Sequence, residues 1–272
     1  MRNPIDLLFP PKCASCGELL PFAGFFPAEP TKESALCPSC LPLWRQEKED
    51  CCGACNEKVA TCSCTTKMMQ TAGCKVFRKL VYYSPGDREK VGNRIVYRIK
   101  DHVDRATVRF LAAELAPLIR ESMSRPEWSG KTFFLSYLPR RYGTVLKGGN
   151  DQAKELAAAL AKELELPLLP LIGRHLKSRA PQKFLTPAKR LSNATGAFYL
   201  RKKRKAEAYG KVAVLVDDIV TSGASMTAGT RLLRQAGAVD FLAVAVASDE
   251  CNRSKSAILP ETKGEFDRPY RR

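Results

Sequence analysis

Two acids and a short polar loop form the stretch of the sequence best suited to chemistry. Asp217 and Asp218 follow five apolar residues, 212–216, and precede the loop Thr221-Ser222-Gly223-Ala224-Ser225. A continuously apolar run is typical of a parallel strand covered on both faces, and open parallel sheets bind ligands at the carboxyl ends of their strands. The loop offers hydroxyls, backbone N–H groups and a glycine, and a helix that starts there directs its positive end to the same place. This order predicts a sugar-phosphate site; the alternative is an ordinary strand–loop–helix connection with a capping serine.

Ten of the eleven cysteines lie before residue 75, with spacings typical of metal ligands. Two sets of four are spaced in this way: Cys13, Cys16, Cys37 and Cys40, and then Cys52, Cys55, Cys62 and Cys64. The first set predicts a structural zinc in a zinc ribbon, since four thiolates leave no open position on the metal. The second predicts another zinc, although its Cys-x-Cys pair is less usual and Cys51 could replace a neighbour. Zinc would supply much of the folding free energy of this region, because few apolar positions in it are periodic. A redox-active Cys-x-x-Cys is the alternative, but no thioredoxin-like strand and helix surround it.

The net charge of +17 over 272 residues is concentrated in one part of the chain. Residues 174–211 hold twelve Lys or Arg against one acid, Glu207, and residues 201–205 are all basic. Such a field indicates an anionic partner, either nucleic acid or a phosphorylated ligand, and the alternative is a solvated loop that serves solubility. No apolar run is long enough to span a bilayer, and residues 1–10 make a poor signal peptide. We therefore expect a cytoplasmic protein without membrane insertion, in which the cysteines are reduced.

Strands and helices alternate after the cysteines. Periodicity predicts strands at 75–83, 132–138, 168–172, 212–216 and 241–247, and helices at 88–100, 107–123, 151–164 and 225–235. Gly237 is expected to close the last helix, and Cys74 to be a small core residue. The alternation predicts an α/β fold with a mostly parallel sheet flanked by helices. The expected domains are a cysteine-rich double zinc ribbon at 1–70, an α/β domain at 71–250 and a flexible basic tail at 251–272.

The loop after Asp218 resembles the phosphoribosyl-pyrophosphate (PRPP) binding loop of type I phosphoribosyltransferases. The resemblance implies that Asp217 and Asp218 bond the ribose hydroxyls and that residues 221–225 hold the 5′-phosphate. Over nearly its full length the chain resembles the ComF family, which joins a zinc ribbon to such a domain and is associated with DNA uptake. Further shared motifs are Gln152-Ala153-x-x-Leu156-Ala157, Gln182-x-x-Leu185 and Arg190-x-x-Asn193-x-x-Gly196-Ala197-Phe198.

The pyrophosphate loop departs from the pattern of that family. Tyr137 stands where the family has the first proline of Pro-x-Pro, and residues 148–152 read Gly-Gly-Asn-Asp-Gln, without the expected arginine. The cations that could still hold the departing diphosphate are Arg140, Arg141 and Lys147. Asp151 would repel it unless it caps the following helix. PRPP would bring Mg²⁺, which prefers phosphate and hydroxyl oxygens.

The resemblance implies a PRPP-binding protein, with possible phosphoribosyltransferase activity, that acts in DNA uptake, with residues 174–193 as a lid over the site. A non-catalytic adaptor is the alternative: the ribbon and the basic segment would bind single-stranded DNA or a DNA-uptake helicase, and the sugar-phosphate site would hold a nucleotide. A transcription regulator that senses PRPP is a third reading, without a helix-turn-helix signal to support it.

Overall fold

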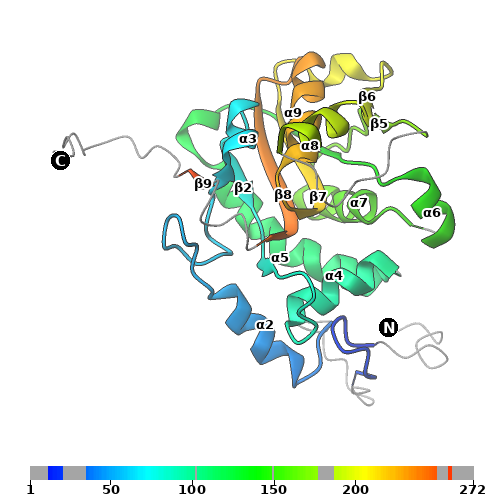
Figure 1. Ribbon diagram of the computed structural model, residues 1–272. Helices are drawn as coiled ribbons and strands as arrows, with labels where there is room; N and C mark the ends of the chain where they lie inside the picture. Colours follow the sequence, from blue (N-terminus) through cyan, green and yellow to red (C-terminus); the bar gives the residue numbers. More distant parts are fainter. Residues whose placement is uncertain are drawn as a thin grey trace.

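A parallel five-stranded sheet forms the centre of the molecule in a computed structural model, which describes residues 12–20, 35–101, 103–148, 150–176, 187–249 and 257–258. Its strands are β2 (Val76–Arg78), β3 (Val81–Tyr83), β4 (Phe133–Tyr137), β7 (Val212–Val220) and β8 (Asp240–Asp249). The order is β2-β8-β7-β4, and β3 pairs with β8 beyond β2 on the same side. Every pairing in this sheet is parallel, as the alternation of strands and helices predicts (Figure 1).

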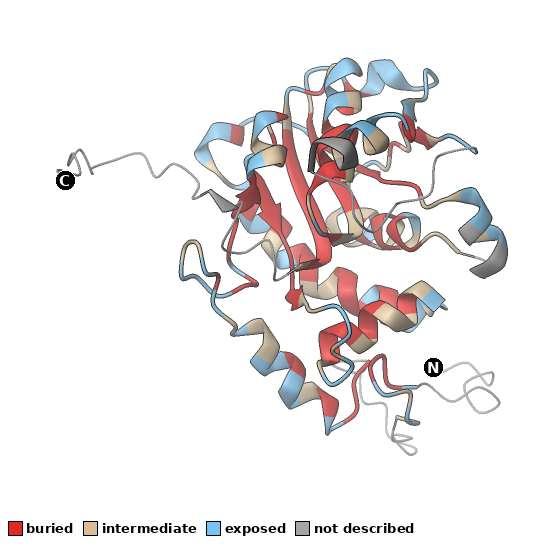
Figure 2. Ribbon diagram, in the orientation of Figure 1, coloured by how far each residue is buried: buried red, intermediate tan, exposed pale blue. Residues whose placement is uncertain are grey.

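Helices cover both faces of the sheet because β7 sends alternate side chains to opposite sides. Val212, Val214 and Val216 pack in one cluster with α5 (Arg105–Met123) and α7 (Gln152–Leu164). Ala213 and Leu215 pack in the other with α9 (Ala224–Gln235). Figure 2 shows the resulting buried centre along the sheet. The predicted fold class, a mostly parallel sheet flanked by helices, is confirmed.

Several short elements surround this centre. Two antiparallel pairs lie outside the main sheet: β5 (Ile172–Arg174) with β6 (Phe198–Leu200), and β1 (Thr65–Thr66) with β9 (Ala257–Ile258). The further helices are α2 (Cys40–Lys48), α3 (Lys67–Thr71), α4 (Val91–Asp101), α6 (Tyr142–Gly148) and α8 (Pro187–Thr195), with single 3₁₀ turns at Pro126–Trp128 and Lys205–Ala208. Among the described residues, no helix is long and apolar enough to cross a membrane.

Four predicted boundaries differ from those of the structure. The strand expected at 75–83 is broken into β2 and β3, and Lys79 between them turns its ammonium towards a cysteine. The strand expected at 168–172 is reduced to one bridge from Leu168 to Leu135, because the proline at 170 lacks the N–H that a ladder needs. β7 runs through both acids to Val220 instead of ending at 216. The helix expected from residue 88 begins at Val91, after a turn in which Asp87 accepts the N–H groups of residues 89 and 90.

The cysteine-rich region packs against the helices of the body. Trp44 of α2 is buried, its ring centroid lies 5.7 Å from that of Phe110 in α5, and its Nε1 donates to Glu114. Glu47 accepts the backbone N–H groups of Val91 and Gly92, at 2.6 and 2.9 Å, and so caps the start of α4. The boundary at residue 70 remains a prediction, and most of the expected tail, like part of the expected lid, lies outside the described residues.

Candidate functional site

A cavity of about 220 Å³ opens at the carboxyl end of β7. Its walls come from β7, from the loop after β4, from the start of α7 and from the β5–β6 pair. It is lined by Leu138, Pro139, Arg140, Asp151, Gln152, Ala153, Arg174, Phe198, Asp217, Asp218, Ile219 and Ser225. We call this the inner cavity. It brings the predicted acids together with one of the predicted cations, as expected where open parallel sheets bind ligands.

The two acids are held side by side on β7. The backbone N–H of Asp218 donates to Oδ1 of Asp217 at 2.9 Å, and that of Ile219 donates to Oδ1 of Asp218 at 2.8 Å. Burial, and then the neighbouring charge of Asp218, raise the pKa of Asp217 well above its usual range. Asp217 is half-buried, and part of its surface is open to the cavity. A ligand hydroxyl could bond both carboxyl groups here.

Residues 221–225 join β7 to α9, and we call them the phosphate loop after their predicted role. Gly223 is the N-cap of α9 with φ of +78°, a left-handed conformation that favours glycine. Ser225 lines the inner cavity, whereas Thr221 lines a different, smaller space beside the cysteines. Ser222 places its Oγ 3.5 Å from the N–H of Ala224. The N-terminal N–H groups of a twelve-residue helix therefore face the region next to Asp217 and Asp218.

Of the cations predicted to hold diphosphate, Arg140 lines the cavity. Its Nη1 donates to the carbonyl of Lys100, which also accepts from Gln152. Arg141 does not line the cavity, although its charge acts on the pKa of Arg174. Lys147 lies within α6, but its side chain is outside the described part of the structure.

Arg174 is a site residue that sequence reasoning missed. It lines the cavity from β5, its Nη1 donates to the carbonyl of Pro139 at 3.2 Å, and its guanidinium lies 4.8 Å from the ring centroid of Phe198. Its buried Nε has no hydrogen-bond partner in the described part of the chain. Burial, and then the charge of Arg141, lower its pKa, while Asp217 opposes this shift. From the sequence it was only the first residue of the basic segment and of the expected lid, 174–193, without a role of its own.

Asp151 acts as the N-cap of α7. Its carboxylate accepts the N–H of Lys154 at 3.3 Å and the N–H of Arg140 at 2.9 Å. Burial raises its pKa, and these two hydrogen bonds oppose the shift. The capping role considered from the sequence is therefore confirmed, and the same carboxylate also fixes the backbone of the loop after β4.

A second cavity of about 270 Å³ adjoins the first, and we call it the outer cavity. The two share Pro139, Arg140, Asp151 and Arg174. Tyr137, which stands where a proline was expected, lines the outer cavity together with Arg201. Arg201 begins the basic block, residues 201–205, all of which are exposed. Arginines thus lie along the way from the inner cavity to the surface, next to the acids Asp151 and Glu155 in the outer cavity.

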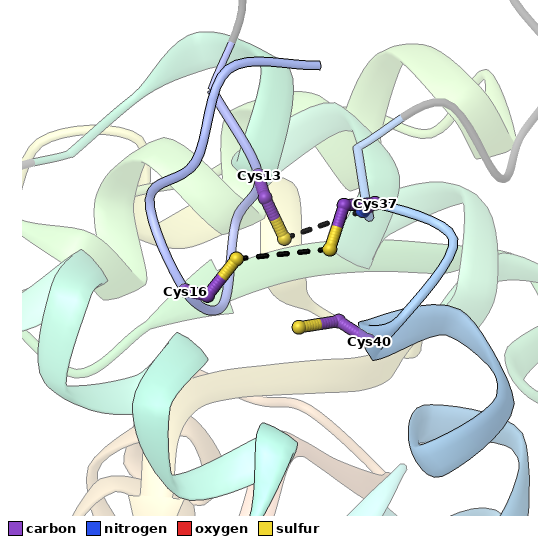
Figure 3. A group of neighbouring side chains, drawn as sticks. All are labelled: Cys13, Cys16, Cys37 and Cys40. Carbon is purple, nitrogen blue, oxygen red and sulfur yellow. Dashed lines mark hydrogen bonds between the residues drawn. The ribbon is translucent and has the colours of Figure 1, made fainter. Parts of the chain in front are cut away.

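The first tetrad, Cys13, Cys16, Cys37 and Cys40, brings two turns together (Figure 3). Its four sulfur atoms lie within 4.8 Å of one another, and those of Cys16 and Cys37 are 3.7 Å apart. Zinc with four sulfurs at about 2.3 Å has sulfur–sulfur edges of about 3.8 Å, so the geometry fits that metal. Burial acts to raise the pKa of Cys13, but backbone hydrogen bonds, foremost from Cys37, lower it to about 7 and favour the thiolate.

The second tetrad consists of Cys52, Cys55, Cys62 and Cys64, whose sulfur atoms also lie within 4.8 Å of one another. Those of Cys55 and Cys62 are 3.6 Å apart, which again fits zinc. Cys51 lies outside this set. Cys74 is fully buried in the core, as predicted. The structure therefore assembles both sets of four that the spacing indicates, and each could hold a zinc ion.

One family model matches part of the chain. Residues 144–260 match the family model of the phosphoribosyl transferase domain. A search among curated proteins found no match. Among solved structures, an adenine phosphoribosyltransferase is 16% identical, with a TM-score of 0.38 over 59% of this chain and 78% of its own. Adenine phosphoribosyltransferase from Leishmania tarentolae is 14% identical, with a TM-score of 0.33 over 55% of this chain and 73% of its own. A hypoxanthine phosphoribosyltransferase from Trypanosoma cruzi is 16% identical, with a TM-score of 0.30 over 55% of this chain and 70% of its own. The stretch that holds Asp217, Asp218 and the phosphate loop is thus similar to the phosphoribosyl transferase domain.

Proposed function

We propose that the protein binds PRPP together with Mg²⁺ in the inner cavity. The observation that carries the proposal is the shared cavity of Asp217 and Asp218 with Arg140 and Arg174, next to a helix N-terminus. The acids would bond the 2′ and 3′ hydroxyls of ribose, and the phosphate loop would bind the 5′-phosphate. The two arginines would bind the diphosphate, a role that suits their forked donors.

The same arrangement suits transfer of the phosphoribosyl group. As the bond from C1 to the diphosphate breaks, positive charge develops on the sugar and negative charge on the leaving group. The carboxylates of Asp217 and Asp218 would favour the first, and the guanidinium groups of Arg140 and Arg174 the second. Mg²⁺, when bound, supplies further charge neutralisation at the diphosphate oxygens. The acceptor would attack C1 from the face opposite the departing diphosphate.

Isothermal titration calorimetry with PRPP and Mg²⁺ tests this proposal. Asp217→Asn/Asp218→Asn keeps the size of both side chains and should abolish the heat of binding. Glu163→Gln/Glu165→Gln removes the same amount of charge at the end of α7 that lies about 18 Å from Gln152, the cavity residue at its start. This variant should bind PRPP as the unchanged protein does. Equal heats in all three proteins, or no heat in any, would contradict the ribose-binding role.

The finer proposal is a ComF-type role in DNA uptake, in which the basic block contacts single-stranded DNA or a helicase partner. A non-catalytic adaptor is the second candidate function. The observation in its favour is the exposure of all five basic residues, beginning with Arg201 at the outer cavity. A DNA strand that lies on this block could place a terminal nucleotide in the inner cavity.

Fluorescence anisotropy with a single-stranded oligonucleotide tests the contact with DNA. Affinity should fall steeply between 50 and 200 mM salt, by roughly tenfold or more for a few phosphate contacts. Lys202→Glu/Lys203→Glu should weaken binding at low salt. An affinity that salt does not change would exclude the electrostatic mode.

A further inference from the structure

The α3 segment, residues 65–73, follows the second tetrad directly and touches both ends of α9. At the start of α9, a Cβ added to Gly223 would lie 2.5 Å from Oγ1 of Thr66 and 2.9 Å from Cγ of Met69. At its end, Nη2 of Arg234 donates to the carbonyl of Ala72 at 3.0 Å. Figure 1 places α3 and α9 together, away from α2. The helix that begins at the phosphate loop is therefore contacted at both ends by a segment that follows Cys64.

Buried side chains link the second tetrad to the phosphate loop. Met69 is completely buried in one cluster with Val220 and Met226, which flank the loop. Between Cys64 and Thr221 lies a small cavity of about 30 Å³. A displacement of the cysteine segment would therefore reach the loop.

The buried side chain of Lys79 indicates that the surroundings of the second tetrad suit a negatively charged metal site. Lys79 is 3% exposed, and its Nζ lies 3.4 Å from Sγ of Cys62 and over the ring of Phe77. An isolated ammonium is costly to bury, so it requires negative charge close by. Four thiolates around one zinc ion keep a net negative charge, which Lys79 matches. The surroundings of the tetrad thus suit the metal-bound form.

The first tetrad faces a different part of the molecule. Arg94 of α4 donates to Oγ of Ser15 at 2.7 Å and lies 3.7 Å from Sγ of Cys40. The adjoining α2 packs on α5 through Trp44 and Phe110. Within the described ranges, these contacts lead to α4 and α5 rather than to the phosphate loop. The two tetrads therefore provide an internal comparison.

We infer that the second tetrad, when it holds its metal, positions the phosphate loop, so that loss of this metal weakens sugar-phosphate binding while loss of the first does not. Thr66 and Met69 are the positioning residues, since they touch the loop and not the ligand. The part of the inference that concerns the ligand rests on the proposed function; the part that concerns the loop does not.

Cys55→Ser and Cys16→Ser form a matched pair, because each removes the least buried thiol of its tetrad. Both variants and the unchanged protein would be compared by zinc content, by hydrogen exchange of the amides at 221–226 and by titration with ribose 5-phosphate. Cys55→Ser should lose one zinc, exchange these amides faster and bind ribose 5-phosphate about tenfold or more weakly. Cys16→Ser should lose one zinc and leave the other two values within about twofold. Thr66→Ala keeps all eight ligands and should also speed exchange at 221–226, which covers the case in which Cys55→Ser does not fold.

The outcomes separate the inference from the proposed function. Equal exchange at 221–226 in the unchanged protein and Cys55→Ser, or equal acceleration in Cys16→Ser, would overturn the positioning role. Unchanged exchange in Thr66→Ala would overturn it too. If the unchanged protein binds neither ribose 5-phosphate nor PRPP, the proposed function fails, while faster exchange confined to Cys55→Ser and Thr66→Ala would still support the role of the second tetrad.

Discussion

Replacing Gly223 by alanine tests how closely the phosphate loop approaches the α3 segment. Its φ of +78° would cost an alanine about 1 kcal/mol. The added Cβ would also lie 2.5 Å from Oγ1 of Thr66, so the loop or the α3 segment must move. Overpacking of this kind costs about 1–3 kcal/mol. We therefore expect Gly223→Ala to lower the free energy of unfolding by roughly 2–4 kcal/mol.

Gly210→Ala is the matched control for this change. Gly210 has a similar φ of +71°, but nothing lies within 4 Å of an added Cβ. It should therefore show the backbone cost alone, about 1 kcal/mol. Urea denaturation measures both variants, and titration with ribose 5-phosphate should show weaker binding in Gly223→Ala only. Equal losses of stability in the two variants would refute the close approach.

Three further predictions follow from single side chains. Because the raised pKa of Asp217 makes the folded state bind its proton more tightly than the unfolded chain, the free energy of unfolding should fall as pH rises from about 4 through that pKa. Asp217→Asn should remove this fall and be more stable at pH 7, and an unchanged pH profile in urea denaturation would contradict the assignment. Arg174→Met should weaken PRPP binding about tenfold or more and leave ribose 5-phosphate binding unchanged in calorimetry, with the exposed Arg204→Met as control; equal losses for both ligands would exclude a diphosphate role. Glu47→Ala removes the acceptor of two N–H groups of α4 and should lower the free energy of unfolding by about 1–3 kcal/mol in urea denaturation; Glu47→Gln, which keeps one amide oxygen, should lose less, and no loss in either would contradict the cap.

Patterns that act over a few residues predicted the centre of the fold and the two tetrads. The apolar run before Asp217 gives β7, and its alternating contacts explain why no polar residue interrupts the run. The strand continues past the acids because ladder pairing uses the backbone, and β8 is long enough to pair with it as far as Val220. A prediction from side-chain polarity alone therefore ended this strand at residue 216, four residues too early.

Contacts between distant parts of the chain were not predictable from the sequence. Arg174 reaches the site because β5 turns away from the main sheet to pair with β6. Local spacing carries no sign of that pairing. The same holds for Glu47, which caps a helix 44 residues further on, and for the α3 segment beside Gly223. The roles of the phosphate loop and of Arg140 in ligand binding remain predictions.

A structure determined with PRPP and Mg²⁺ bound would locate each part of the ligand. We expect both ribose hydroxyls within hydrogen-bonding distance of Asp217 and Asp218, the 5′-phosphate at residues 221–225, and the diphosphate against Arg140 and Arg174. PRPP bound on the exposed basic block at 201–205, or an inner cavity without ligand at saturating concentration, would contradict this prediction.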